Sequence, residues 1–186
     1  MTTHDHLLSI LAERSARRGQ FTLASGQQST LYIDARLTTM SPDGLALIGP
    51  LALAALRATA WRIDAVGGLT LGADPISYAI AYASATSQAP LRAFTVRKEA
   101  KAHGTGRLIE GPFREGDRVA VIEDVITTGG SALRAAEAIR TAGGSVSGVL
   151  ALVDREEGGR EALENAGLSV ISIARASEIV RRLPAA

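Results

Sequence analysis

From residue 61 to the end of the chain, apolar runs of strand length alternate with segments in which apolar residues repeat at helical spacing. The strand-like runs cover residues 61–68, 91–96, 119–122, 147–153 and 169–173. The helical segments cover about 74–85, a stretch that starts at Ala132, 161–165 and a last one that includes Ile179 and Val180. This alternation predicts an α/β fold with a mainly parallel central sheet flanked by helices, and ligands at the carboxyl ends of its strands.

The first part of the chain has a different pattern. Residues 5–17 predict an amphipathic helix that stops at Gly19. Residues 21–34 then contain two short β-prone runs joined by a polar turn with Ser25 and Gly26, which is the pattern of a hairpin.

A further helix is expected before the first core strand. Ser41, Pro42 and Asp43 have the order of a helix start, and the helical pattern continues to about residue 58. Pro50 removes one helical hydrogen bond, so we expect a kink or a break near residue 49.

Length, charge and cysteine content limit the class of protein. The 186 residues fit one α/β domain with a small appendage. A net charge of +1 provides no bulk attraction for nucleic acid or an anionic membrane. Cysteine is absent, which excludes disulfides and fits a reducing compartment. The N-terminus does not resemble a signal peptide, and no apolar run reaches the ~18 residues that span a bilayer, so we expect a cytoplasmic protein.

The segment 118–131 changes character twice, from strand to loop to helix. An apolar run, 119–122, precedes Glu123 and Asp124, and Thr127 to Ser131 form a turn of small residues before the helix. Adjacent glycines let several N–H groups converge, Ser131 can cap the helix, and the helix N-terminus attracts an anion, so the turn can hold a phosphate. The two acids can accept hydrogen bonds from sugar hydroxyls or hold a hydrated divalent cation.

A second glycine-rich turn follows the strand that ends near residue 68. Gly67 and Gly72 have the spacing of a nucleotide P-loop, but Ala73 and Asp74 stand where that motif needs Lys and Ser or Thr, which excludes it. A short turn of this kind can still present backbone N–H groups to a pyrophosphate.

The use of lysine marks a third segment. Of the twenty basic residues eighteen are Arg, and the only lysines are Lys98 and Lys101, close to His103. This clustering indicates that the segment needs compact ammonium groups. Residues 97–111 have little apolar periodicity and many glycines, so they predict a mobile loop that is either functional or merely solvated.

Arg155 follows the strand 147–153 and completes a set of four loops, after residues 68, 97, 124 and 154, at one sheet edge. Taken alone, an arginine in Asp-Arg-Glu-Glu is more often part of a surface ion pair. The four loops nevertheless predict a single cleft, because the carboxyl ends of parallel strands meet at one edge.

Three of these strings resemble one family. Residues 118–131 resemble the phosphoribosyl pyrophosphate (PRPP) motif of type I phosphoribosyltransferases. Residues 97–104 are similar to the catalytic loop Arg-Lys-x-x-Lys-x-His-Gly of orotate phosphoribosyltransferases, and 21–34 to the string that contributes to their N-terminal hood. The chain departs from the family at Ala24, where many members carry a basic residue, which puts one pyrophosphate or base contact in question.

The resemblance implies transfer of ribose 5-phosphate from PRPP to orotate in pyrimidine synthesis. It implies a type I phosphoribosyltransferase-like fold, with residues 1–40 contributing to the hood and 61–175 forming the PRPP-binding core of a single domain, 1–186. It also implies Mg²⁺ held mainly by PRPP, with Asp124 as a candidate for a contact through water. Finally, it implies a homodimer in which the loop from Arg97 to Gly111 closes over the partner's site.

The same resemblance assigns site residues. Lys101 and Asp124 are the catalytic candidates. PRPP is assigned to Arg97, Lys98, Lys101, His103, Glu123, Asp124, Val125, Ile126, Thr127, Thr128, Gly129, Gly130 and Ser131. The pyrophosphate loop is Gly68, Leu69, Thr70, Leu71 and Gly72, and the orotate contacts are Thr127, Arg155 and Tyr32.

Two other functions share parts of this pattern. A phosphoribosyltransferase for another base would keep the PRPP motif but has no evident need for Arg155 or the lysine-containing loop. A non-catalytic PRPP-binding regulator would keep the phosphate contacts, lose the basic loop and show a basic face for nucleic acid, which the net charge of +1 disfavours.

Overall fold

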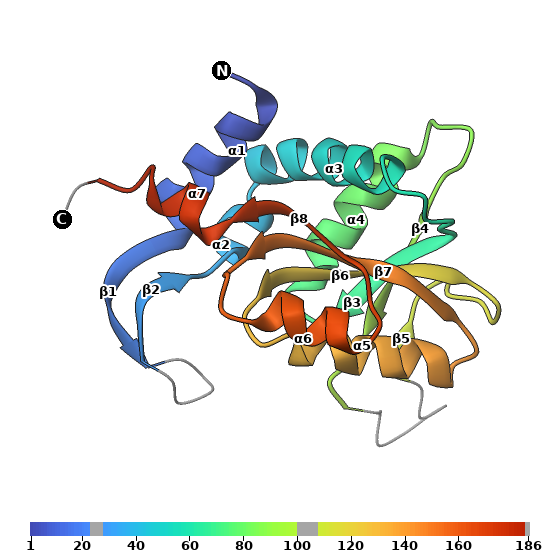
Figure 1. Ribbon diagram of the computed structural model, residues 1–186. Helices are drawn as coiled ribbons and strands as arrows, with labels where there is room; N and C mark the ends of the chain where they lie inside the picture. The colour runs from blue at the N-terminus through green and yellow to red at the C-terminus, as the bar shows by residue number, and fades with distance from the viewer. Residues whose placement is uncertain (23–27, 100–107, 185–186) are drawn as a thin grey trace.

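The computed structural model describes residues 1–22, 28–99 and 108–184, and it contains two sheets (Figure 1). A two-stranded antiparallel ribbon pairs β1 (Ala16–Thr22) with β2 (Gln28–Ile33). The main sheet has six strands in the order β5-β4-β3-β6-β7-β8. These are β3 (Ala65–Leu69), β4 (Arg92–Val96), β5 (Ile109–Glu110), β6 (Arg118–Ile126), β7 (Ser145–Asp154) and β8 (Val170–Arg175). All neighbours are parallel except β4 and β5, which confirms the mainly parallel sheet.

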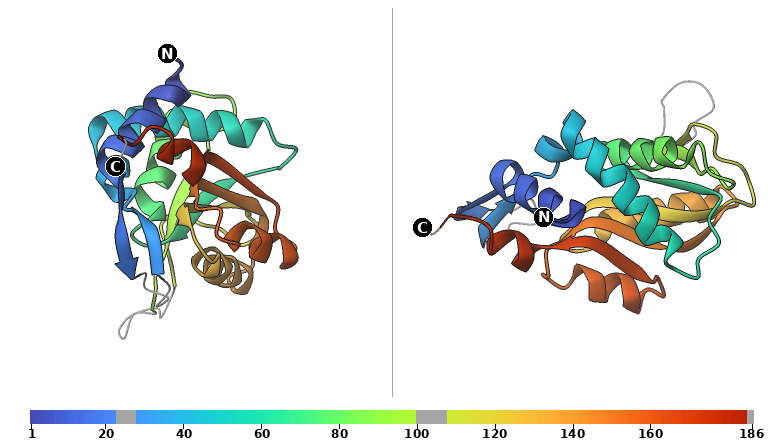
Figure 2. Two further views of the ribbon diagram at one scale, coloured as in Figure 1. Left: turned by 60° about the vertical axis from the view of Figure 1, so that its left-hand side comes forward. Right: turned by 90° about the horizontal axis from the view of Figure 1, so that it is seen from above.

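Helices cover both faces of this sheet (Figures 1 and 2). On one face, α1 (Thr3–Ile10), α3 (Pro42–Arg57), α4 (Ala73–Ser84) and α7 (Ala176–Val180) pack over Ala120 and Ile122 of β6. On the other, α5 (Gly130–Thr141) and α6 (Gly159–Asn165) pack over Val119 and Val121. Successive residues of a strand point to opposite faces, so a strand covered on both sides is apolar without interruption.

The N-terminal helix is shorter than predicted. α1 ends at Ile10, a π-helical turn (Leu11–Ser15) follows, and β1 starts at Ala16. Residues 16–18 pair with 31–33 of β2, and Ala16 is buried. The prediction of a helix over 5–17 stopping at Gly19 was therefore wrong for its last part, because strand pairing overrides the local helical pattern; Gly19 lies in β1.

Two other boundaries differ from the sequence prediction. The first core strand starts at Ala65 and not at Trp61, whose ring instead lies so close to Gly148 of β7 that a side chain there would collide with it. α3 runs through Pro50 without the break considered at residue 49. Its buried residues and the close approach of Gly49 to Ala79 of α4 hold the helix together although one hydrogen bond is lost.

A short helix, α2 (Arg36–Thr39), connects the ribbon to α3 and brings β2 to the carboxyl edge of the main sheet. Within the described ranges, no helix is both long and apolar enough to cross a lipid bilayer.

Candidate active site

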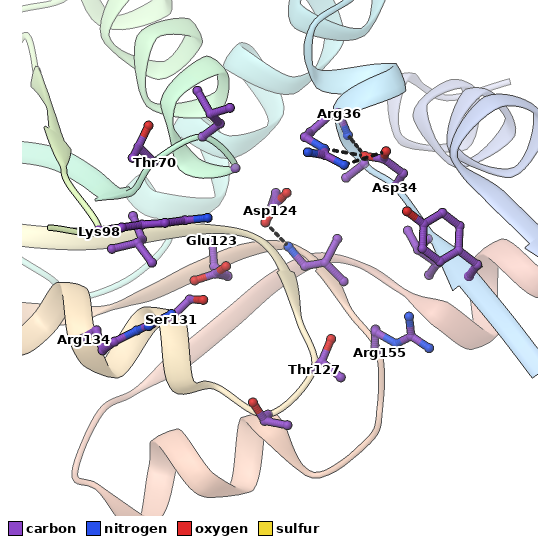
Figure 3. Close-up of a pocket in the computed structure, with 18 residues that line it drawn as sticks. Asp34, Arg36, Thr70, Lys98, Glu123, Asp124, Thr127, Ser131, Arg134 and Arg155 are labelled. Carbon is purple, nitrogen blue, oxygen red and sulfur yellow. Dashed lines mark hydrogen bonds and ion pairs between the residues drawn. The ribbon is translucent and has the colours of Figure 1, made fainter. Parts of the chain in front are cut away.

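One cleft of about 460 Å³ lies where the carboxyl edge of the main sheet meets β2 and α2 (Figure 3). All four loops that the sequence placed at this edge contribute to it, so their convergence is confirmed. The cleft is lined by Tyr32, Ile33, Asp34, Ala35, Arg36, Leu69, Thr70, Leu71, Gly72, Lys98, Glu123, Asp124, Val125, Thr127, Thr128, Ser131, Arg134 and Arg155.

The two acids lie inside β6 and not beyond its end, because the strand continues to Ile126. Burial, and then the charge of Asp124, raise the pKa of Glu123 to about 8. Burial also raises the pKa of Asp124, whose Oδ1 accepts a hydrogen bond of 2.9 Å from the N–H of Val125. Oε2 of Glu123 is buried without a partner. Buried polar atoms are rarely left unsatisfied, so this pair is suited to a ligand that brings hydroxyl groups or a cation.

A smaller hollow of about 100 Å³ lies beneath the turn 127–131 and is lined by Glu123 and residues 125–131. Gly129 precedes α5 and has a left-handed φ of 80°. A side chain at this position would collide with α6. Ser131 lies in the first turn of α5 and does not cap it, so that part of the prediction was wrong. The unpaired N–H groups and the positive end of this twelve-residue helix make the hollow suited to an anion of phosphate size.

The loop 69–72 forms the opposite wall. The N–H of Thr70 donates to the Val96 carbonyl at 2.8 Å, and its hydroxyl donates to Asp74 at 2.7 Å. Asp74 also accepts from Thr95 at 2.8 Å, which ties this loop to β4. Gly72 lies against Asp124, since a Cβ there would come within 2.5 Å of the carboxylate. Of the predicted loop 68–72, Gly68 lies in β3 against the Ile122 carbonyl, and residues 69–72 line the cleft.

Only part of the basic loop belongs to the described residues. Lys98 is exposed and lines the cleft. Arg97 lines an adjoining hollow, with its Nη1 3.8 Å from Glu110. Lys101 and His103 lie outside the described residues, as do Ala24, Ser25 and Gly26 of the hairpin.

Arg155 is not a surface residue, although Asp-Arg-Glu-Glu alone favoured a surface ion pair. Its side chain is 3% exposed, and Nη2 donates to Glu157 and to the Leu31 carbonyl at 2.8 Å, and to Ser29 at 3.0 Å. Its Nε is buried without a partner. A buried guanidinium in a ligand cleft is suited to bind a carboxylate.

Tyr32 of β2 also lines the cleft, with its ring centroid 5.3 Å from that of Phe21. Since Arg155 is bound to Ser29 and Leu31 of the same strand, the two predicted base contacts are held together by the ribbon.

Sequence reasoning missed three charged residues of the cleft. Asp34 and Arg36 enter from the end of β2 and the start of α2, and Arg134 enters from α5, one turn after Ser131. The charge of Arg134 partly opposes the rise in the pKa of Glu123. The i, i+3 spacing from Ser131 could have identified Arg134, but nothing in the sequence shows that the ribbon reaches the sheet edge.

Comparison with known proteins gives relatives over most of the chain, although no protein-family model matches it. An orotate phosphoribosyltransferase of Aquifex aeolicus (strain VF5) is 45% identical over 183 residues, which covers 97% of this chain and 99% of that protein. One of Sorangium cellulosum (strain So ce56) is 47% identical over 171 residues, covering 91% and 88%.

A solved structure has the same fold. The crystal structure of Mycobacterium tuberculosis H37Rv orotate phosphoribosyltransferase in complex with PRPP superposes with a TM-score of 0.81 at 38% identity, and covers 96% of this chain and 99% of that chain. The similarity thus extends over nearly the whole chain.

Proposed function

This chain belongs to the orotate phosphoribosyltransferase family, and we propose that it transfers the ribose 5-phosphate group of PRPP to orotate, giving orotidine 5′-monophosphate and pyrophosphate in pyrimidine synthesis. Its fold is the type I phosphoribosyltransferase fold. The observation that carries the proposal is the arrangement along one cleft of a phosphate-sized hollow, two half-buried acids and a buried arginine.

Each part of PRPP has a matching surface. The 5′-phosphate fits the hollow at the N-terminus of α5, where backbone N–H groups and the helix dipole stabilise it. The ribose hydroxyls fit Glu123 and Asp124, which lie between that hollow and the loop 69–72. The pyrophosphate group would then contact this loop and Lys98. The sequence resemblance adds Arg97, Lys101 and His103 to its contacts.

The reaction breaks the bond between C1′ and a pyrophosphate oxygen, and the orotate ring nitrogen forms the new bond to C1′ and gives up its proton. Negative charge grows on the leaving group while the ribose becomes oxocarbenium-like. The protein must therefore stabilise the departing pyrophosphate, hold the base in line and exclude water. Lys101 is proposed to stabilise the leaving group, and Arg155, Thr127 and Tyr32 to hold orotate.

The residues of the cleft fit Mg²⁺ that is held mainly by the substrate. Asp124 and the unsatisfied Glu123 offer carboxylate oxygens, but the described residues include no cluster of three or more metal-ligating side chains. Mg²⁺ keeps much of its water and is commonly shared between one or two carboxylates and substrate phosphates. We propose a contact through water to Asp124, where the ion would neutralise charge on the pyrophosphate.

A direct assay tests the proposed function. Purified protein with PRPP and Mg²⁺ should consume orotate, followed by the loss of its absorbance, and should not convert uracil, hypoxanthine or adenine at a comparable rate. Faster conversion of another base would assign the chain to that base. Binding of PRPP without conversion of any base would support the regulator.

Replacing Arg155 with alanine should raise the KM for orotate by about tenfold or more and change the KM for PRPP much less, because a charged hydrogen bond is lost to one substrate only. Steady-state kinetics with each substrate varied in turn measure this. Ser29→Ala is the matched control, since it removes one anchor of Arg155 at 3.0 Å and keeps the guanidinium. Equal effects on both substrates would make Arg155 a purely structural link to the ribbon.

We also propose that the protein is a homodimer whose basic loop closes over the partner's site. Three large side chains with apolar surface are exposed on neighbouring segments: Leu71 (61%) at the cleft, and Tyr78 (53%) and Tyr82 (86%) one turn apart on α4, the helix that follows it in the chain. Exposed apolar side chains grouped in this way support contact with another subunit. That the loop reaches across to the partner's cleft follows from the family resemblance.

Mixing two damaged enzymes should restore activity if the loop acts in the partner's site. A Lys101→Ala chain and an Asp124→Asn chain would form mixed dimers with one doubly damaged site and one intact site. Activity should rise well above that of either parent after subunit exchange, which tagged chains can verify. If exchange occurs and activity stays at the level of the parents, the loop acts on its own subunit.

A further inference from the structure

One wall of the cleft carries an ion pair between Arg36 and Asp34, to which no sequence motif assigned a role. Arg36 donates from Nε to Oδ1 of Asp34 at 2.8 Å and from Nη2 to Oδ2 at 2.9 Å. Its backbone N–H donates to the same Oδ1 at 3.1 Å. A guanidinium has five N–H donors, so these two side-chain bonds leave three of them for another group.

The backbone that carries this ion pair is held in place by hydrogen bonds and packing. The N–H of Asp34 donates to the Ser15 carbonyl at 2.8 Å, and the hydroxyls of Ser15 and Thr38 are 2.8 Å apart in a buried position. Ala35, between the two charged residues, is 1% exposed. The backbone is therefore fixed while the Arg36 side chain, 49% exposed, extends into the cleft. A cation held in place before a ligand arrives loses less side-chain entropy on binding.

The position of Arg36 in the cleft is defined by its neighbours. Burial raises the pKa of Asp124, and the charge of Arg36 partly opposes this rise. Tyr32 also interacts electrostatically with Arg36. Gly72 of the loop 69–72 borders the same Asp124 carboxylate. Figure 3 shows Arg36 across the cleft from Asp124, with Thr70 to one side and Arg155 farther away. Arg36 thus lies near the candidate ribose contact Asp124, whose carboxylate also borders the loop 69–72 that is the candidate pyrophosphate loop.

We propose that Arg36, held by Asp34, binds the pyrophosphate group of PRPP from within the same subunit. The proposal rests on the proposed function of the cleft. Pyrophosphate is the ligand group at the reacting carbon that carries several negative charges, and a guanidinium binds phosphate oxygens through paired N–H donors. Asp34 is a positioning residue, because its two hydrogen bonds hold the guanidinium of Arg36 in place.

Two other roles for Arg36 are less well supported by the contacts. As a surface ion pair it would contribute little to stability, because exposed ion pairs are weak, and it would not need to line a ligand cleft. As the partner of the orotate carboxylate it would duplicate Arg155, which is buried and has an unsatisfied Nε.

The test compares Arg36→Met with Arg14→Met. Arg14 also makes a two-bond pair, from Nη1 and Nη2 to Asp43 at 2.8 and 2.6 Å, but it does not line the cleft. Binding of Mg²⁺-pyrophosphate without orotate would be measured by calorimetry, and the KM values for PRPP and orotate by steady-state kinetics. Arg36→Met should weaken pyrophosphate binding and raise the KM for PRPP by about tenfold to a hundredfold, and change the KM for orotate little. Arg14→Met should change none of these.

Two additional variants separate binding from folding. Arg36→Lys should recover part of the pyrophosphate affinity, since a charge returns without the fork. Asp34→Asn should weaken pyrophosphate binding less than Arg36→Met, and the double variant should be no worse than Arg36→Met alone, because both changes act through one guanidinium. Unchanged pyrophosphate affinity in Arg36→Met, or a larger effect on orotate than on PRPP, would overturn the inference. Failure of the unmodified protein to convert orotate would instead overturn the proposed function.

Discussion

Replacing Lys101 with alanine is expected to lower kcat by about 10² or more while changing PRPP binding much less. The physical reason is that charge on pyrophosphate grows as the bond to C1′ breaks, so a cation placed at the leaving group stabilises the transition state more than the bound substrate. Steady-state kinetics and calorimetric PRPP binding together measure the two effects.

Lys101→Arg is the matched variant. It keeps the positive charge and changes its shape, and since the chain uses lysine only at positions 98 and 101, we expect it to recover only part of the lost turnover. If Lys101→Ala instead keeps its kcat and loses PRPP affinity, Lys101 is a ground-state phosphate contact. Full recovery in Lys101→Arg would contradict the need for a compact ammonium group.

Replacing Asp124 with asparagine is expected to raise the KM for PRPP and lower turnover, with a combined loss in kcat/KM of about tenfold to a hundredfold for PRPP. Asparagine has nearly the same shape as aspartate, but the substitution removes the charge from hydrogen bonds to ribose, each worth roughly 1.5–3 kcal/mol. The fold should remain intact, because Oδ1 of asparagine can still accept from the Val125 N–H. Burial raises the pKa of Asp124 because it disfavours the charged carboxylate, so the substitution removes an unfavourable buried charge.

Asp64→Asn is the control for this change. Asp64 binds Arg118 at 2.7 Å at the opposite end of β6. This variant should leave the kinetics of both substrates unchanged, and thermal unfolding of the two variants would show whether either alters the fold. Normal kcat and KM values for PRPP in Asp124→Asn would remove Asp124 from the set of ribose contacts.

The sequence predicted the core of the fold because its signals are local. The apolar run 119–122 is uninterrupted because helices cover both faces of β6, and the glycine-rich turn after it marks the start of α5. Where tertiary contacts compete with local preference, the prediction failed. Residues 16 and 17 belong to the predicted helix but form a strand, because pairing with β2 satisfies their backbone groups.

The sequence by itself determined the α/β class, the family and the four loops at the carboxyl edge of the sheet, since each of these depends on the order of residues along a short segment. Only the tertiary structure decided that one oxygen of Glu123 is buried without a partner, that Arg155 is bound to β2, and that Arg36 lines the cleft. Burial, pKa shifts and hydrogen bonds between distant segments depend on what lies around a side chain in space. The ribbon of β1 and β2 is packed against the sheet edge by contacts that no local pattern specifies.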